Sequence, residues 1–122
     1  MLVDFWASWC VPCVQQMRSL AKLTDNLSKQ GLIFLGINWG DDDPTAALEF
    51  LKKNHYEWIN LRADNETTAA WMLNGVPLVA VIDPQGEIAY YHTGYEEPEE
   101  AAIVKALRKI NPSLSTGAAL CQ

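Results

Sequence analysis

The order of apolar segments in the first 38 residues constrains the fold of this chain more than any other feature. Residues 2–6 are apolar apart from Asp4, and residues 32–38 form a second run rich in Ile, Leu and Phe. Such continuous runs are typical of strands that are buried on both faces. Between them, helical spacing extends from Val11 until Gly31, with apolar positions at Val14, Met17, Ala21 and Leu27. A helix between two such strands predicts a right-handed βαβ unit.

The rest of the chain predicts further strands and helices joined by turns. Asp43 followed by Pro44 is a typical helix start, and we expect that helix to continue to about Asn54. We interpret the acidic residues 41–43 as a solvated start of this helix, since they lack the ligand spacing and central glycine of a calcium loop. The other expected elements are a strand at 58–61, a helix at 66–73, strands at 78–82 and 88–92 around a turn at 83–86, and a helix at 98–110.

This order predicts a single α/β domain. We expect a central mixed sheet of four to five strands with helices on both faces, in which the first strand lies between strands 32–38 and 78–82. The edge of strand 32–38 stays unpaired unless residues 58–61 cover it. With 122 residues, 49% of them hydrophobic, the chain can build one core, which we place at residues 1–112, followed by a flexible tail at 113–122.

Composition narrows the function classes. The net charge is -6 with only nine Lys and Arg residues, which argues against a nucleic-acid or anionic-membrane surface, because phosphate binding needs clustered basic side chains. No apolar stretch approaches the roughly 20 residues that a membrane-spanning helix needs. The start of the chain also lacks the basic and small-residue features of a signal peptide. Three cysteines are too few for a disulfide framework.

The pair Cys10 and Cys13 lies where the first strand gives way to the helix. At a helix N-terminus, unpaired backbone N–H groups and the macrodipole favour an anion, so we predict a lowered thiol pKa for Cys10 and assign it as the nucleophile. Cys13, one turn further and on the buried side, is predicted to resolve the mixed disulfide that Cys10 forms with a substrate. The alternative, half of a zinc site, needs two further ligands, and His55 and His92 lack the spacing for it.

Asp4 is the candidate base for the proton of Cys13. A carboxylate within an apolar strand is costly unless its pKa rises or it finds a partner, and a raised pKa suits proton transfer near neutral pH. Alternatively, Asp4 pairs with a lysine such as Lys52 or Lys53, and the sequence leaves both interpretations open. Pro12 stiffens the loop between the cysteines and removes an N–H that a helix start would leave unpaired.

Two segments together make the chain resemble the thioredoxin superfamily, specifically its TlpA/ResA-like thiol-disulfide oxidoreductases. They are WASWCVPC at residues 6–13 and NGVPLVAVIDPQGEI at residues 74–88. The resemblance covers nearly the whole chain and implies a thioredoxin-like fold. The family's N-terminal β-hairpin is missing, so we expect a trimmed version of that fold.

The resemblance also implies roles for residues around the cysteine pair. Pro77 is expected to be a cis-proline packed against that pair, and the backbone of Val76 is expected to bind an extended substrate segment. Trp6 and Trp9 match the two aromatic positions that flank the family site, where one packs inside and the other borders the thiolate; the alternative, favoured more for Trp6 than for Trp9, is ordinary packing. The expected substrate-binding residues are therefore Trp9, Pro12, Val76 and Pro77.

The chain departs from the family pattern at several positions. Members often carry Glu three residues after the second cysteine, where this chain has Gln16, so an acid-base role is not expected there. Leu78 and Val79 replace the usual pair of threonines after the proline, which predicts a more apolar substrate groove. Asp4 instead matches the buried aspartate of thioredoxin proper.

The function implied by the resemblance is a reductase of disulfides in extracytoplasmic proteins such as apocytochrome c. Its partners would be protein disulfide or dithiol substrates and an upstream thiol reductant, with no cofactor, no metal, no nucleic acid and no membrane contact, and with the chain as a monomer. The location implied is periplasmic or otherwise extracytoplasmic, with the cytoplasm as the alternative. Competing functions are a general cytoplasmic thioredoxin and a non-catalytic binding module that uses the groove at the proline loop.

A third cysteine, Cys121, is the second-last residue of the sequence, in a segment rich in Ser, Gly and Ala. A thiol there can form an intermolecular disulfide. We favour the simpler interpretation of an incidental exposed thiol.

Overall fold

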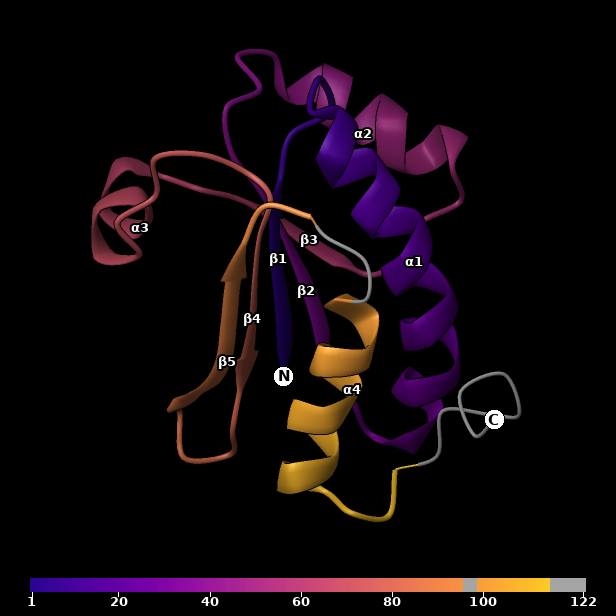
Figure 1. The fold of residues 1–122 in the computed structure, drawn as a ribbon. Coiled ribbons are helices and arrows are strands. Elements are labelled where there is room, and N and C mark those ends of the chain that lie inside the picture. Colours follow the sequence, from indigo (N-terminus) through magenta and orange to yellow (C-terminus); the bar gives the residue numbers. More distant parts are fainter. Residues whose placement is uncertain (96–98, 115–122) are drawn as a thin grey trace.

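The structure is a computed structural model that describes residues 1–95 and 99–114. Its helices and strands follow the predicted order, as Figure 1 shows. In chain order the elements are β1 (Leu2–Trp6), α1 (Val11–Leu27), the short 3-10 helix η1 (Ser28–Gln30), β2 (Phe34–Asn38), α2 (Pro44–Lys53), β3 (Ile59–Arg62), α3 (Asn65–Ala70), β4 (Leu78–Ile82), β5 (Ile88–Thr93) and α4 (Glu99–Ile110).

The strands of the described chain form one sheet in the order β3-β2-β1-β4-β5. β1 lies in the middle, parallel to β2 and antiparallel to β4. β3 pairs with β2 in parallel and covers the edge that would otherwise stay open, while β5 continues the sheet antiparallel to β4. The predicted mixed sheet is therefore confirmed. Because β1, β2 and β3 run in parallel, their carboxyl ends meet at one edge of the sheet.

Helices lie on both faces of the sheet, as predicted (Figure 1). Side chains of β1 point alternately to the two faces. On one face Leu2 joins a buried cluster with Leu20 of α1 and Ile103 of α4. On the other face Phe5 contacts Trp71, which follows α3, with ring centroids 5.0 Å apart. Asp4, between Leu2 and Trp6 on the same side of β1, therefore faces α1.

α1 buries Met17 and Leu27 as predicted, but not the other two predicted positions. Val14 and Ala21 are only half-buried. The buried positions are Cys13, Gln16, Met17, Leu20, Leu23, Thr24 and Leu27. Apolar spacing alone placed this face only in part, because two of its members, Gln16 and Thr24, are polar. The predicted end of the helical segment is confirmed, since Gly31 follows η1 with a left-handed φ of 95°.

α3 is shorter than predicted. It ends at Ala70 instead of continuing to residue 73, and Met72 takes a left-handed φ of 51°. The physical reason lies in the residues on either side of Met72. Trp71 and Leu73 both pack against the sheet face that carries Phe5, and a continued helix would turn them to different directions.

Packing continues as far as Leu114, which joins the buried cluster of α1 and α4, two residues beyond the boundary expected at 112. Residues 115–122, which include Cys121, lie outside the described residues. Among the helices that the structure describes, none has the length and apolar character to cross a membrane.

Candidate active site at the start of α1

Cys10 and Cys13 are joined by a disulfide at the start of α1, with their Cα atoms 5.2 Å apart. Cys10 is the N-cap residue of the helix, with extended backbone (φ -89°, ψ 107°), and its Sγ accepts a hydrogen bond from the backbone N–H of Cys13 at 3.2 Å. Pro12 lies in the first turn, where its missing N–H leaves no donor unpaired. The sequence prediction that Cys10 lies at the helix N-terminus is thus confirmed.

The two sulfur positions differ in what surrounds them. Cys13 is fully buried, and Cys10 keeps 5% of its surface exposed. The neighbours Trp9 and Val11 are 61% and 67% exposed. The first turn of α1 carries no acidic side chain, so nothing there offsets the positive end of the helix dipole. An anion on the sulfur of Cys10 would therefore be stabilised by the helix, while the sulfur of Cys13 is shielded from solvent.

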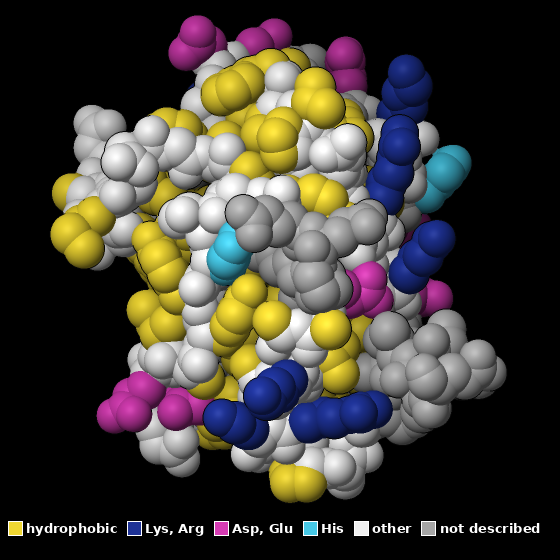
Figure 2. Space-filling model, in the orientation of Figure 1, with side chains coloured by type: hydrophobic (Ala, Val, Ile, Leu, Met, Phe, Trp, Pro, Cys, Tyr) yellow, Lys and Arg dark blue, Asp and Glu magenta, His cyan; other side chains and the backbone are white. Residues whose placement is uncertain are grey.

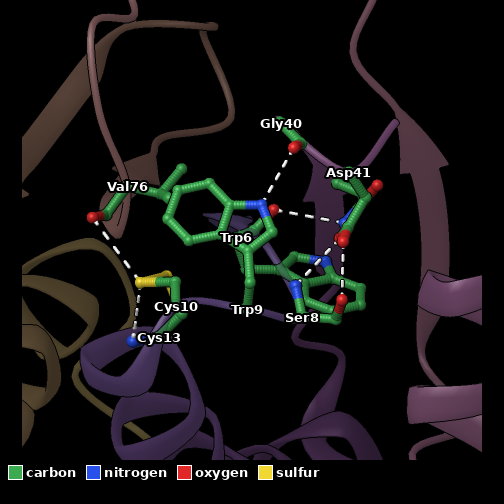
Figure 3. The surroundings of a disulfide bond; sticks show 9 residues. Trp6, Ser8, Trp9, Cys10, Cys13, Gly40, Asp41 and Val76 are labelled. Atoms are coloured by element: carbon green, nitrogen blue, oxygen red, sulfur yellow. Dashed lines mark hydrogen bonds between the residues drawn. A yellow bond between two sulfur atoms is a disulfide. The ribbon is translucent and has the colours of Figure 1, made fainter. Parts of the chain in front are cut away.

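The loop before β4 lies against the reactive pair. The peptide bond between Val76 and Pro77 is cis, as the family resemblance implied. The carbonyl oxygen of Val76 is 3.7 Å from Sγ of Cys10 (Figure 3). Pro77 is buried and Val76 is half-buried. The structure thus brings Cys10, Pro12, Val76 and Pro77 into one region, although the chain separates the two pairs by more than 60 residues.

The two tryptophans that flank the cysteine pair lie in different surroundings. Trp6 is fully buried, and its Nε1 donates to Oδ1 of Asn60 at 3.0 Å. Trp9 is 61% exposed beside Cys10, and its Nε1 donates to the carbonyl oxygen of Gly40 at 2.9 Å. In the space-filling view, hydrophobic side chains gather at the end of the molecule where α1 begins (Figure 2).

Leu78 and Val79 do not form an apolar substrate groove, and that prediction is wrong. The two residues are 2% and 0% exposed, and their side chains belong to the buried clusters on opposite faces of the sheet. Because β4 lies next to the central strand, residues that follow Pro77 are covered by helices on both sides.

Asp4 is 1% exposed in the middle of β1, where it is paired in register with Gly36 and Val79. It shares its side of the strand with Trp6, which packs with Cys13 and Met17 of α1. Lys52 and Lys53 lie exposed in the last turn of α2. Asp4 therefore lies on the side of β1 that faces α1, and its role as proton acceptor for Cys13 stays a prediction.

Gln16 is a second buried polar side chain on the same face of α1, one turn after Cys13. It is 1% exposed, and neither its amide oxygen nor its amide nitrogen has a hydrogen-bond partner among the described residues. The sequence analysis only excluded acid-base chemistry at this position. Helical spacing from Cys13 was the signal that could have placed Gln16 in the interior.

Asp41 corrects the interpretation of residues 41–43 as a solvated helix start. Asp42 and Asp43 are exposed, but Asp41 is 5% exposed. Its carboxylate accepts hydrogen bonds from the backbone N–H of Ser8 at 2.8 Å, from Oγ of Ser8 at 2.5 Å and from Nδ2 of Asn38 at 2.6 Å. Sequence reasoning missed this cluster because it treated the three aspartates as one segment. The parallel pairing of β1 and β2, which puts both strand ends at one edge, was the signal that could have found it.

Burial alone would raise the pKa of Asp41, because it disfavours the charged form. Hydrogen bonds from the Ser8 hydroxyl, the Asn38 amide and the Ser8 backbone oppose that effect, and the positive charge of Arg62 adds to them. Together they hold the pKa of Asp41 below its ordinary value, so the carboxylate is charged at neutral pH.

The two histidines stand apart from the cysteine pair. His55 is exposed after α2, and His92 lies on β5 with its Nδ1 3.2 Å from the carbonyl oxygen of Gly94. Within residues 1–95 and 99–114, no group of three or more His, Cys, Asp and Glu side chains is arranged to hold a metal ion.

Comparisons with known proteins agree with this geometry. The profile of the protein family described as Redoxin matches residues 1–107. The thiol:disulfide interchange protein HelX of Rhodobacter capsulatus is 37% identical over 89 residues, which make up 71% of this chain and 48% of HelX. The thiol-disulfide oxidoreductase ResA of Bacillus subtilis is 24% identical over 116 residues, which make up 94% of this chain and 63% of ResA. The chain therefore spans only about half to two thirds of the length of these relatives.

A solved structure assigned as a thiol:disulfide interchange protein DsbE from Chlorobium tepidum has the same fold. Its TM-score is 0.80 at 24% sequence identity, and the match covers 89% of this chain and 77% of that one. The thioredoxin-like fold predicted from residues 6–13 and 74–88 is confirmed by this match and by the sheet order.

Proposed function

From the premise that this chain belongs to the Redoxin family, we propose that it is a protein thiol-disulfide oxidoreductase that works through Cys10 and Cys13. The observation that carries the proposal is the disulfide itself. It joins the N-cap residue of a helix, beside exposed Trp9 and Val11, to a fully buried cysteine one turn further. This asymmetry gives two identical side chains two different roles.

The proposed reaction runs from the dithiol form of the chain. The thiolate of Cys10 attacks one sulfur of a substrate disulfide, forms a mixed disulfide and releases the other substrate sulfur as a thiolate. Cys13 then loses its proton and attacks the Cys10 sulfur, which releases the second substrate sulfur. The substrate has gained two electrons, and the chain is left with the Cys10–Cys13 disulfide, the state of this structure.

We assign Asp4 as the acceptor of the Cys13 proton. It is buried in β1 on the side that faces α1, the helix whose first turn holds the buried Cys13. Asp4→Asn should slow turnover near neutral pH while the fold is kept. The pH profile of the rate under single-turnover conditions tests this, and a profile equal to that of the wild type would remove Asp4 from the mechanism.

The region around Cys10 supports a substrate that is an extended polypeptide. Trp9, Val11 and Pro12 are exposed beside the sulfur, and the backbone of Val76 lies 3.7 Å from it. An extended segment could place its own sulfur at Cys10 while its backbone lies along residues 75–76, with Pro77 beneath it.

The physiological setting is proposed from the resemblance to TlpA/ResA-like proteins. We place the chain outside the cytoplasm, with apocytochrome c as a candidate substrate and an upstream thiol reductant that restores the dithiol. These statements concern the whole protein. HelX is about twice as long as the part of it that this chain matches.

Reduction of insulin by the full chain, recycled with dithiothreitol, tests the proposed activity. We expect the rate to exceed that of dithiothreitol alone and Cys10→Ser to return it to that background. A wild-type chain that binds insulin without accelerating its reduction would contradict the proposal and favour a non-catalytic binding module.

A further inference from the structure

We propose that Asp41 is a positioning residue for the thiol chemistry of Cys10, acting through Ser8 and the loop that joins β1 to α1. The inference rests on the proposed function, because it concerns the same cysteine. It adds a residue that comes from a different part of the sheet and does not touch the sulfur.

Asp41 and Ser8 are joined by two hydrogen bonds. One carboxylate oxygen accepts the backbone N–H of Ser8 at 2.8 Å, and the other accepts its hydroxyl at 2.5 Å. Figure 3 shows the two side chains facing each other across the gap between the loops. Two bonds from one carboxylate fix both the position and the orientation of Ser8, which stands two residues before Cys10.

The next residue, Trp9, is held by the same loop after β2. Its indole Nε1 donates to the carbonyl oxygen of Gly40, the residue before Asp41, at 2.9 Å. Gly40 has a left-handed φ of 90°, and a Cβ at this position would lie 3.1 Å from the Trp9 ring. The loop after β2 therefore holds both residues that precede Cys10.

Asp41 is itself held by residues at the ends of two strands, β2 and β3. Asn38, the last residue of β2, donates to its carboxylate at 2.6 Å and to the carbonyl oxygen of Trp6 at 3.3 Å. Arg62, the last residue of β3, donates to the backbone carbonyl oxygen of Asp41. The carboxyl ends of three parallel strands are thus joined to the loop before α1 through one buried aspartate, β2 through its carboxylate and β3 through its backbone carbonyl.

These contacts fix the position of the Cys10 sulfur at the N-terminus of α1. After Ser8 and Trp9, the backbone N–H of Cys10 donates to the carbonyl oxygen of Ala7 at 3.2 Å, and its sulfur accepts from Cys13. The benefit that the sulfur gains from the helix N-terminus falls off within the first turn, so a small displacement of the loop changes it. Asp41 keeps Cys10 in the place where a thiolate is stabilised.

A general role in stability predicts a different result from a role in positioning. If Asp41 only held the loop after β2, its bonds should end on α2 or on the strands. Two of the three bonds to its carboxylate instead end on Ser8, in the loop that carries the nucleophile.

The test compares the full chain with Asp41→Ala, Asp41→Asn and Ser8→Ala, with Asp42→Ala as the matched control. Asp42 is the exposed neighbour, so its loss removes the same charge and leaves the contacts of Asp41 in place. The readouts are the pH dependence of iodoacetamide alkylation of Cys10 in the reduced chain, the rate of insulin reduction, and thermal unfolding.

We expect Asp41→Ala to lower the rate constant for insulin reduction roughly tenfold, as the loss of hydrogen bonds to a charged group would. The alkylation profile should move to higher pH in Asp41→Ala and, by less, in Ser8→Ala, while Asp42→Ala matches the wild type. Ser8→Ala keeps the charge of Asp41 and removes one bond, so it remains informative if Asp41→Ala fails to fold.

Two results would overturn the inference. One is an alkylation profile in Asp41→Asn and Ser8→Ala that stays within twofold of the wild type. The other is a profile that moves to lower pH in Asp41→Asn and is unchanged in Ser8→Ala, which would assign Asp41 a purely electrostatic effect. If the wild type does not reduce insulin, the proposed function fails, but the alkylation profiles still decide the role of Asp41.

Discussion

α1 and α2 begin with the same type of N-terminal cap. Each helix follows a residue with extended backbone, whose side chain accepts a backbone N–H of the first turn, and each has a proline within its first two positions. In α2 the acceptor is Oδ1 of Asp43, 2.9 Å from the N–H of Thr45. In α1 it is Sγ of Cys10, 3.2 Å from the N–H of Cys13.

The difference between them lies in the capping atom and its surroundings. Asp43 is exposed, and its carboxylate accepts a hydrogen bond from one backbone N–H of the helix start. Cys10 is 5% exposed and carries a sulfur that can become an anion only after the disulfide is reduced. The same electrostatic position thus stabilises the fold in α2 and, in the proposed mechanism, stabilises the reactive thiolate in α1.

Replacing the sulfur at the start of α1 should have the largest effect. Cys10→Ser should lower the rate of insulin reduction above the dithiothreitol background by more than about a thousandfold, because the nucleophile is lost. Serine is itself a good N-cap, so the helix should still form. Circular dichroism and the insulin assay check both parts, and retained activity would contradict the assignment of Cys10 as the nucleophile.

Replacing the buried partner should stop the reaction one step later. Cys13→Ser leaves the thiolate of Cys10 free to attack, but no second thiol can release the substrate. We expect the variant to accumulate a mixed disulfide with a protein substrate, detected by mass spectrometry under non-reducing conditions. If no such adduct forms with Cys13→Ser while the wild type turns over, the resolving role of Cys13 is wrong.

Much of this contrast could be predicted from the sequence. The capping role of Asp43, the position of Cys10 and the central place of β1 all follow from local rules on helix starts and apolar runs. Contacts between distant segments could not be obtained in this way. The bonds of Asp41 to Ser8 depend on the register of β1 with β2, and the burial of Gln16 depends on which face α1 turns to the sheet.

Replacing the carboxylate at the start of α2 should have a moderate effect on stability and none on chemistry. Asp43→Ala should lower the free energy of unfolding by about 1 kcal/mol, the typical contribution of an N-cap side chain. Urea unfolding measures it, with Asp42→Ala as the exposed control. A loss of insulin reduction in Asp43→Ala would contradict the separation of the two helix starts.

The smallest expected effect is a loss of stability in acid. It should come from the carboxylates of Asp41 and Asp64 and not from the disulfide. Backbone and side-chain hydrogen bonds with Thr67 lower the pKa of Asp64, the N-cap of α3. For Asp41, burial alone would raise the pKa, but its hydrogen bonds and Arg62 bring it below its ordinary value as well. The folded state therefore binds protons at Asp41 and Asp64 less readily than the unfolded state does. The stability that these two carboxylates contribute is present above their ordinary pKa of 3.8 and is lost as the pH falls below it.

Urea unfolding of the oxidised chain at a series of pH values checks this expectation. The disulfide at the start of α1 does not titrate, so it contributes nothing to the change. Asp64→Asn should lose less stability than the wild type on acidification. Equal losses in the two proteins would show that the cap of α3 does not contribute.

The most direct measurement is the thiol pKa of Cys10 in the reduced chain, followed by the ultraviolet absorbance of its thiolate, with Cys13→Ser and Cys121→Ser combined to isolate the signal. The account predicts a value clearly below that of a free cysteine, about 8.5, because the helix start stabilises the anion. A value at or above that of the free thiol would contradict it.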